Sequence, residues 1–120
     1  MERRRRTETT QMKGKGKIRG LEAIDEMAGV FASLGSAPRL RLLFLLYHRP
    51  DLTVGELAKS AGTSISGVSM HLKRLREAGL VCCRRDGQSV CCALASGSQP
   101  VRMLREAFRK IAEETGCCGI

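Results

Sequence analysis

The chain has 120 residues and a mass of 13.1 kDa, which suits one domain and excludes a TIM barrel or a full dinucleotide-binding enzyme. Hydrophobic residues make up 42% of the chain but aromatic residues only 3%, so the core must be aliphatic and platforms for stacking single-stranded bases are nearly absent. The net charge of +9 favours nucleic acid as a partner over an anionic membrane surface.

Most of this charge lies in residues 1–20, which hold eight Lys or Arg and two acidic residues. With few large apolar residues, this segment is predicted to be a disordered basic arm, serving either for phosphate contact or for solubility. Arg3–Arg6 are not followed by the apolar stretch of a secretory signal. No run approaches the roughly 20 apolar residues of a membrane span, so a cytoplasmic protein without a membrane partner is expected.

Four helices are expected before any strand. Apolar residues at three- and four-residue steps predict a helix over 21–34. A nearly all-apolar helix over about 38–48 follows and should be the central buried element. The spacing of a capping box opens a short helix over 54–60. Ser64 is then expected to cap a longer helix that runs to about Ala78.

Two strand-like runs, 80–85 and 88–94, are joined by Asp86-Gly87, which predicts a β-hairpin with these two residues in a type I′ turn. A last amphipathic helix follows over about 100–115. The sequence thus predicts a mainly α fold with a small β-hairpin, in the order α-α-α-α-β-β-α. A helix, a glycine turn, a second helix and a hairpin are typical of a winged helix-turn-helix. Three regions are expected: a basic arm (1–20), a DNA-binding and dimerisation domain (21–115) and a cysteine-containing tail (116–120).

The helix after the glycine turn presents hydroxyl and basic side chains on its outer face. Small hydroxyls let the backbone approach a groove, and the basic residues are placed to reach phosphates. An arginine pair beside the hairpin turn suits contact with the minor groove or the DNA backbone. The serines also suit ordinary helix caps, and His71 also suits a packed position. The expected DNA-contacting residues are Ser64, Ser66, Ser69, Met70, His71, Lys73, Arg74, Arg84, Arg85 and Gln88.

Three segments resemble, in order, the ArsR/SmtB family of metal-sensing repressors, over about residues 21–112. Leu34–Leu43 is similar to the family's LADPTRLRIL segment, Ser64–Val81 to its recognition helix, and Arg84–Gly87 to the wing's RREG. The resemblance implies a homodimeric repressor on a palindromic double-stranded operator, with the first and last helices at the dimer interface. It implies that ligand binding weakens operator affinity, that DNA binding needs no cofactor, and that the chain is not an enzyme.

The chain departs from the family where that family's ligands usually lie. Thr53–Leu57 stands in place of the CVCDL-type arsenic run and has no cysteine. The last helix lacks the Asp/His/Glu pattern of the family's zinc site. Ile65 and Gly67 replace the common Gln and Ala of the recognition helix, so base readout is expected to differ. Metal ligands are therefore expected elsewhere in the chain.

The six cysteines form three vicinal pairs, all in the last third of the chain. Clustered thiols in a reducing compartment point to metal or redox chemistry. With Asp86-Gly87 as the turn residues, Cys82 is predicted to lie directly opposite Cys91, and Cys83 and Cys92 diagonally on the other face. The predicted metal ligands are Cys117 and Cys118 first, with a third thiol from the hairpin cysteines Cys82, Cys83, Cys91 and Cys92.

Thiolates select soft ions, and three of them suit As(III) or Sb(III), the expected inducers, while Hg(II), Cd(II) and Pb(II) come second. Two further roles for the cysteines stay open: thiol oxidation, which needs two cysteines and no metal, and plain packing in the core. A winged helix acting as a protein-interaction or architectural module also stays open. A thiol enzyme would need a Cys-x-x-Cys or Cys–base arrangement that the chain lacks.

Overall fold

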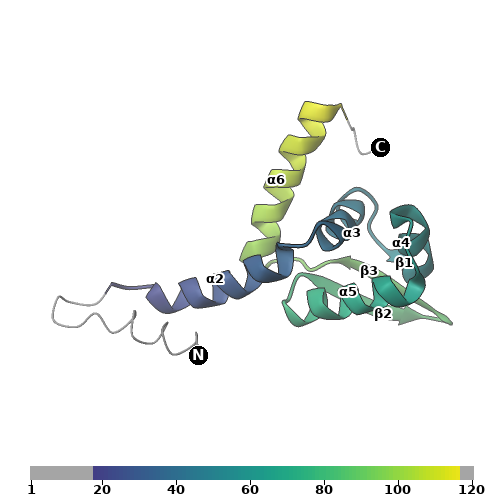
Figure 1. Ribbon diagram of the computed structural model, residues 1–120, viewed down its shortest axis with the longest axis horizontal. Helices are drawn as coiled ribbons and strands as arrows, with labels where there is room; N and C mark the ends of the chain where they lie inside the picture. The colour runs from purple at the N-terminus through teal and green to yellow at the C-terminus, as the bar shows by residue number, and fades with distance from the viewer. Residues whose placement is uncertain (1–17, 117–120) are drawn as a thin grey trace.

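A computed structural model describes residues 18–116 (Figure 1). The predicted winged helix-turn-helix is confirmed, and each helix boundary lies within one residue of its predicted position. One element, the two-residue strand β1, was not expected from the sequence. The expected boundaries of the basic arm and of the cysteine tail lie largely outside the described residues. The elements are α2 (Leu21–Leu34), α3 (Ala37–His48), β1 (Leu52–Thr53), α4 (Val54–Ala61), α5 (Ile65–Glu77), β2 (Val81–Asp86), β3 (Ser89–Leu94) and α6 (Gln99–Thr115).

Local hydrogen bonds explain where the helices begin. The Thr53 hydroxyl accepts from the Glu56 backbone N–H at 3.0 Å, and the Glu56 carboxylate accepts from the Thr53 N–H at 2.9 Å, which completes the predicted capping box. The Ser64 hydroxyl likewise accepts from the Gly67 N–H at 3.0 Å and caps α5. Between these helices Gly62 has a φ of 69°, a left-handed conformation that favours glycine. These contacts fix the helix-turn-helix in place.

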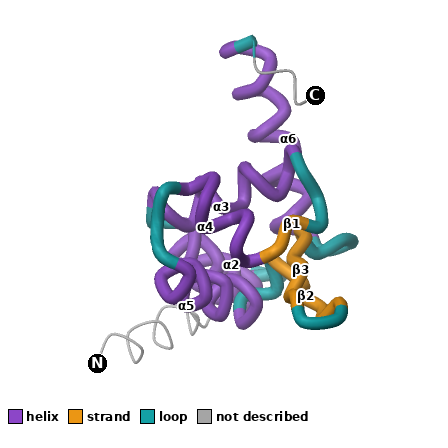
Figure 2. Tube along the Cα trace, turned by 90° about the vertical axis from the view of Figure 1, so that its right-hand side faces the viewer, coloured by secondary structure: helices purple, strands orange, loops and turns teal. Residues whose placement is uncertain are grey.

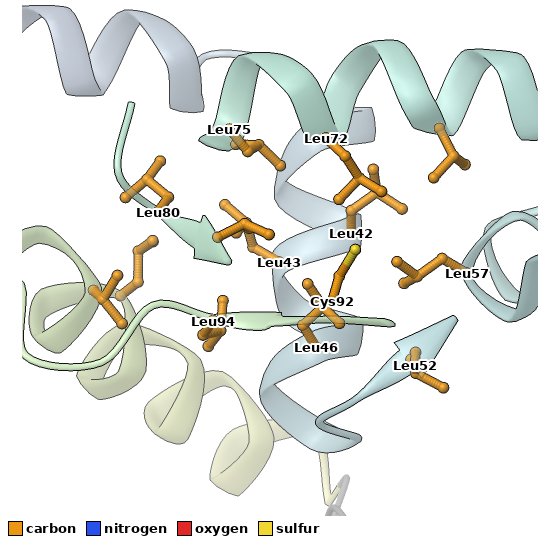
Figure 3. Close-up of a cluster of buried hydrophobic side chains, with 14 of the residues drawn as sticks. Leu42, Leu43, Leu46, Leu52, Leu57, Leu72, Leu75, Leu80, Cys92 and Leu94 are labelled. Carbon is orange, nitrogen blue, oxygen red and sulfur yellow. The ribbon is translucent and has the colours of Figure 1, made fainter. Parts of the chain in front are cut away.

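The core lies between α3, α4, α5 and one face of the sheet (Figure 3). The helix α3 is central, as predicted, and Leu42, Leu43 and Leu46 are almost wholly buried. Leu57 of α4 and Leu72 of α5 reach the same cluster. The cluster is mainly aliphatic, as the low aromatic content requires, and Phe108 is its buried aromatic member among the described residues. Its remaining buried members are Leu52, Ala58, Val68, Leu75, Leu80, Val81, Cys92, Leu94, Val101 and Leu104.

The three strands form an antiparallel sheet in the order β1-β3-β2. The predicted register of the hairpin is wrong. Asp86 pairs with Ser89, so the turn residues are Gly87 and Gln88, and the positive φ of 69° falls on Gly87. A glycine at the first central position is typical of a type II′ turn rather than type I′. The Asp-Gly pair predicts a turn correctly but leaves open which two residues stand at its centre.

The corrected register changes which cysteines face each other. Cys83 lies directly opposite Cys92, whereas Cys82 lies opposite Ala93 and Cys91 opposite Arg84. The predicted direct pairing of Cys82 with Cys91 is therefore wrong, and the pair that was expected to be diagonal is the facing one. Because side chains alternate along a strand, Cys83 and Cys92 share the core face, and Cys82 and Cys91 share the outer face.

Helix α2 extends sideways from this body in Figure 1, and α6 rises from it in both views (Figures 1 and 2). None of the residues of α2 is buried, although its apolar stripe was predicted from the sequence. Phe31, for example, is 51% exposed. A groove of about 220 Å³ runs between α2 and the start of α6, and its lining includes Met27, Phe31 and Met103.

In the part of the chain that the structure describes, no single helix is long and apolar enough to cross a bilayer. Helices α2 and α3 meet the criteria of length and composition together, but they are bent by 92°.

Candidate nucleic-acid interface and thiol pair

The outer face of α5 is the first part of the candidate site. Val68, Leu72 and Leu75 hold the inner face of the helix in the core. At 100° per residue, the opposite stripe carries Ser66, Met70 and Lys73. These three side chains are exposed, as are the predicted contacts Ser64, Ser69 and Arg74 on the flanks of the stripe. The helix thus offers hydroxyl, thioether and cationic groups to a groove.

Ile65 was not among the predicted contacts, although it lies at the first position of α5 and is 58% exposed. An exposed aliphatic side chain next to the serines can pack on a thymine methyl group. Its position directly after the capping serine was the signal that sequence reasoning passed over.

His71 lies to one side of the exposed stripe. It is half-buried and lines a pocket of about 270 Å³ together with Pro38 and Arg41 of α3 and Thr63 of the turn. Its Nδ1 atom is buried and has no hydrogen-bond partner among the described residues. The side chain therefore packs toward α3, and contact of His71 with DNA stays a prediction.

The hairpin is the second part of the site, and its two arginines lie on opposite faces. Arg85 shares the core face with Cys83, whereas Arg84 points to the outer face beside Cys91. Arg84 forms an ion pair with Asp51, with 3.7 Å between Nη1 and Oδ1. Arg85 and Gln88 are exposed at the tip. Arg85 is thus the arginine that lies on the same side of the sheet as α5.

The facing thiols of Cys83 and Cys92 form the third feature. Cys92 is 1% exposed and its sulfur lies among leucines (Figure 3), while Cys83 is half-buried. Burial raises the pKa of Cys92 to about 12, and a hydrogen bond with Cys83 contributes to the increase, while the charge of Arg76 opposes it. Cys92 therefore stays protonated at neutral pH.

The predicted metal ligands are not brought together in the part of the chain that is described. No group of three or more His, Cys, Asp or Glu side chains forms a metal site there. Cys82 is exposed on the outer face, apart from the Cys83–Cys92 pair. Cys117 and Cys118 lie outside the described residues. Gly116, the last described residue, ends α6 on the side away from the hairpin (Figure 1).

The chain is similar to known regulators of transcription. Residues 37–82 match the family model described as "Bacterial regulatory protein, arsR family". The transcriptional regulator YgaV of Escherichia coli is 38% identical over 71 residues, which span 58% of this chain and 72% of YgaV. A transcriptional repressor SmtB homolog of Synechocystis is 38% identical over 97 residues, which span 81% of this chain and 69% of the homolog.

Two further relatives extend the comparison. The cadmium resistance transcriptional regulatory protein CadC of Listeria innocua is 31% identical over 64 residues, which span 53% of this chain and 54% of CadC. Among solved structures, the homodimeric winged helix-turn-helix DNA-binding domain of Mb0332 from Mycobacterium bovis superposes with a TM-score of 0.66 at 28% identity, covering 86% of this chain and 92% of that one.

The fold and its exposed helix define a winged helix-turn-helix regulator of transcription rather than an enzyme. The chain belongs to the ArsR/SmtB family.

Proposed function

We propose that the chain is a dimeric repressor that reads a palindromic operator with α5 and the hairpin and releases it when a soft metal(loid) binds its thiols. The observation that supports DNA reading is the exposed stripe of α5, where Ser66, Met70 and Lys73 point away from the core. Arg85 and Gln88 extend the same surface at the hairpin tip. Hydroxyl groups and cations in this arrangement suit base edges and phosphates.

The proposed dimer rests on α2 and α6. Their apolar side chains Ile24, Met27, Phe31, Met103 and Ile111 are each at least 40% exposed in the single chain. Exposed apolar surface gathered on two neighbouring helices is typical of a protein interface. The described domain of Mb0332 is a homodimer, which supports the same assembly here. A two-fold dimer presents two copies of α5 and therefore fits a palindrome.

The proposed inducer rests on the chemistry of the cysteines. CadC, a relative, is named for cadmium resistance. Among the described residues the structure pairs two thiols, Cys83 and Cys92, fewer than the three that As(III) or Sb(III) would take. The proposal therefore places the first two ligands at Cys117 and Cys118. Because α6 ends on the side away from its own hairpin (Figure 1), we propose that the third thiol comes from the hairpin of the partner subunit.

Two measurements test this function. Selection from random duplex DNA by the reduced protein should enrich sequences that share a palindrome. Enrichment of sequences with no palindrome in common would contradict the proposal that the protein recognises an operator. Fluorescence anisotropy on a selected duplex then follows release by arsenite, antimonite, mercuric, cadmium or lead ions. Release should be lost in Cys117→Ser/Cys118→Ser, and Cys82→Ser, which removes an exposed hairpin thiol, tests whether that thiol is the third ligand. Binding indifferent to every ion would refute the inducer.

A further inference from the structure

The Cys83–Cys92 pair has geometry that suits a covalent bond. In an antiparallel ladder, directly opposed pairs alternate between hydrogen-bonded and non-hydrogen-bonded positions. The Ala95 N–H donates to the Leu80 carbonyl at 3.0 Å, which makes that pair a hydrogen-bonded one. Counting along the register from Leu80, the pair formed by Cys83 and Cys92 falls on a non-hydrogen-bonded position.

Non-hydrogen-bonded pairs bring their Cα atoms to about 4.5 Å and their side chains closest together. This separation lies within the range of about 4.4–6.8 Å that disulfides span. Both side chains lie on the same face of the sheet at directly opposed positions. Joining them requires side-chain rotation and little backbone movement.

The two cysteines differ in a way that suits sequential oxidation. Cys83 is half-buried, so an oxidant in solvent can reach it, whereas Cys92 is 1% exposed. Burial and the hydrogen bond with Cys83 keep the pKa of Cys92 high, so Cys92 remains a protonated thiol until it attacks. Arg76 of α5 supplies positive charge close to the pair.

We propose that the wing contains a thiol switch in which a hydroperoxide converts Cys83 and Cys92 into a cross-strand disulfide that weakens DNA binding. The Cys83 thiolate attacks one peroxide oxygen, the O–O bond breaks, and the departing oxygen takes up a proton to leave as water or an alcohol. Cys83 is then a sulfenic acid. The Cys92 sulfur attacks it, loses its proton, and water leaves as the S–O bond breaks. Two thiols give up two electrons, and these reduce one hydroperoxide.

The link to DNA binding follows from where the pair lies. Cys92 places its sulfur among Leu42 and its neighbours beneath α5 (Figure 3), and Cys83 lies two residues before Arg85. A disulfide shortens the sulfur–sulfur contact to about 2.05 Å. It therefore draws the Cys92 sulfur away from the leucines beneath α5, and a small adjustment of the two strands changes where Arg85 lies relative to α5. We expect affinity for a selected duplex to fall by about 5–150-fold, the usual range of allosteric coupling.

Peptide mapping tests the bond without reference to DNA. Trypsin cuts after Arg84 and Arg85, so peptides 77–84 and 86–102 separate unless a disulfide joins them. The test protein is Cys82→Ala/Cys91→Ala/Cys117→Ser/Cys118→Ser, which retains only the facing pair. After treatment with hydrogen peroxide, the joined peptides should appear without reductant and separate with it. The same protein with Cys83→Ala added is the control. Absence of the joined peptides from the test protein would overturn the proposal.

Anisotropy with the same two proteins tests the switch, and this readout rests on the proposed function. Peroxide should weaken DNA binding by the test protein, with recovery on reduction, and leave the Cys83→Ala control unchanged. A disulfide that forms without any change in affinity would overturn the switch. Failure of the reduced protein to bind any duplex would refute the proposed function instead, and peptide mapping would still decide the bond. A second control, Cys92→Ala, removes the other thiol of the pair. Its DNA binding should be equally insensitive to peroxide, which would show that the result with Cys83→Ala does not come from a folding defect.

Discussion

The body formed by α3, α4, α5 and the sheet differs from the α2–α6 pair in how its apolar side chains are covered. Leu57 of α4 is fully buried within the single chain, whereas Phe31 of α2 is 51% exposed. Both residues belong to apolar stripes that the sequence predicts with similar clarity. The difference shows that periodicity identifies an apolar face but not what covers it. The body and the buried residues Val101, Leu104 and Phe108 of α6 complete a core within one chain, whereas the exposed face of α2 and α6 requires a second copy.

The largest effect on stability is expected in the body. Leu57→Ala removes a fully buried side chain and leaves a cavity, so the free energy of unfolding should fall by about 2–5 kcal/mol. Urea denaturation followed by circular dichroism measures this change. Met70→Ala, on the exposed stripe, is the control and should have almost no effect. Equal losses in both variants would contradict the contrast between covered and uncovered faces.

The opposite test applies to the α2–α6 face. Phe31→Glu places a charge on an exposed apolar surface beside the groove lined by Met27 and Met103. We expect a folded monomer at concentrations at which the parent is a dimer, because burying the carboxylate in an interface costs more than leaving it in water. Sedimentation velocity measures the mass. Arg102→Glu, also exposed on α6, is the control for added negative charge. A Phe31→Glu variant that remains dimeric would place the interface elsewhere.

Alkaline pH should destabilise the body through Cys92. Its pKa is raised to about 12 in the folded chain by burial, so the folded state resists losing that proton while the unfolded state loses it more readily. The stabilising contribution is therefore complete below the ordinary thiol pKa and is lost as the pH rises toward 12. Thermal unfolding between neutral and alkaline pH measures this loss. Cys92→Val has no proton to lose at this position, so its unfolding temperature should fall less steeply with pH. An equally steep fall in both proteins would contradict the role of Cys92.

The smallest expected effects concern the helix caps. Ser64→Ala removes the hydroxyl that accepts from Gly67 and should cost about 1 kcal/mol in the free energy of unfolding. Ser98→Ala removes the corresponding cap of α6, where the hydrogen bond to the Val101 N–H is longer, 3.3 Å. We expect the loss at Ser98 to be smaller, as chemical denaturation of the two variants would show. A larger loss at Ser98 would contradict the ranking.

The helices could be predicted because their signals are local. The capping box at Thr53 and Glu56 and the turn glycine Gly62 act within a few residues, and both appear as expected. The hairpin register could not be fixed, because a glycine at position 87 fits either the first or the second place of a two-residue turn. Because of that single ambiguity, the predicted facing pair was Cys82 and Cys91, whereas the observed pair is Cys83 and Cys92. The strand β1 is too short to leave a pattern, since its two residues pair with β3 through tertiary contact.

The candidate site divides in the same way. The exposed serines of α5 follow from helical periodicity, but the half-buried position of His71 depends on its packing against Pro38 and Arg41, far away in sequence. Arg84 and Arg85 lie on opposite faces because side chains alternate along a strand, so their placement follows once the strand is known. The ion pair of Arg84 with Asp51 depends on the tertiary fold. Sequence therefore identifies the candidate DNA-contacting residues more readily than the face of the helix or sheet on which each one lies.

The most direct test of the central claim is the salt dependence of duplex binding by two double variants. Lys73→Ala/Arg85→Ala removes one cation from the outer face of α5 and one from the hairpin tip, whereas Lys59→Ala/Lys110→Ala removes two exposed cations from α4 and α6. We expect the first variant to bind more weakly and to lose about 1.8 from the slope of log K against log salt, at about 0.9 per phosphate contact. Equal slopes for the two variants would contradict DNA reading by α5 and the wing.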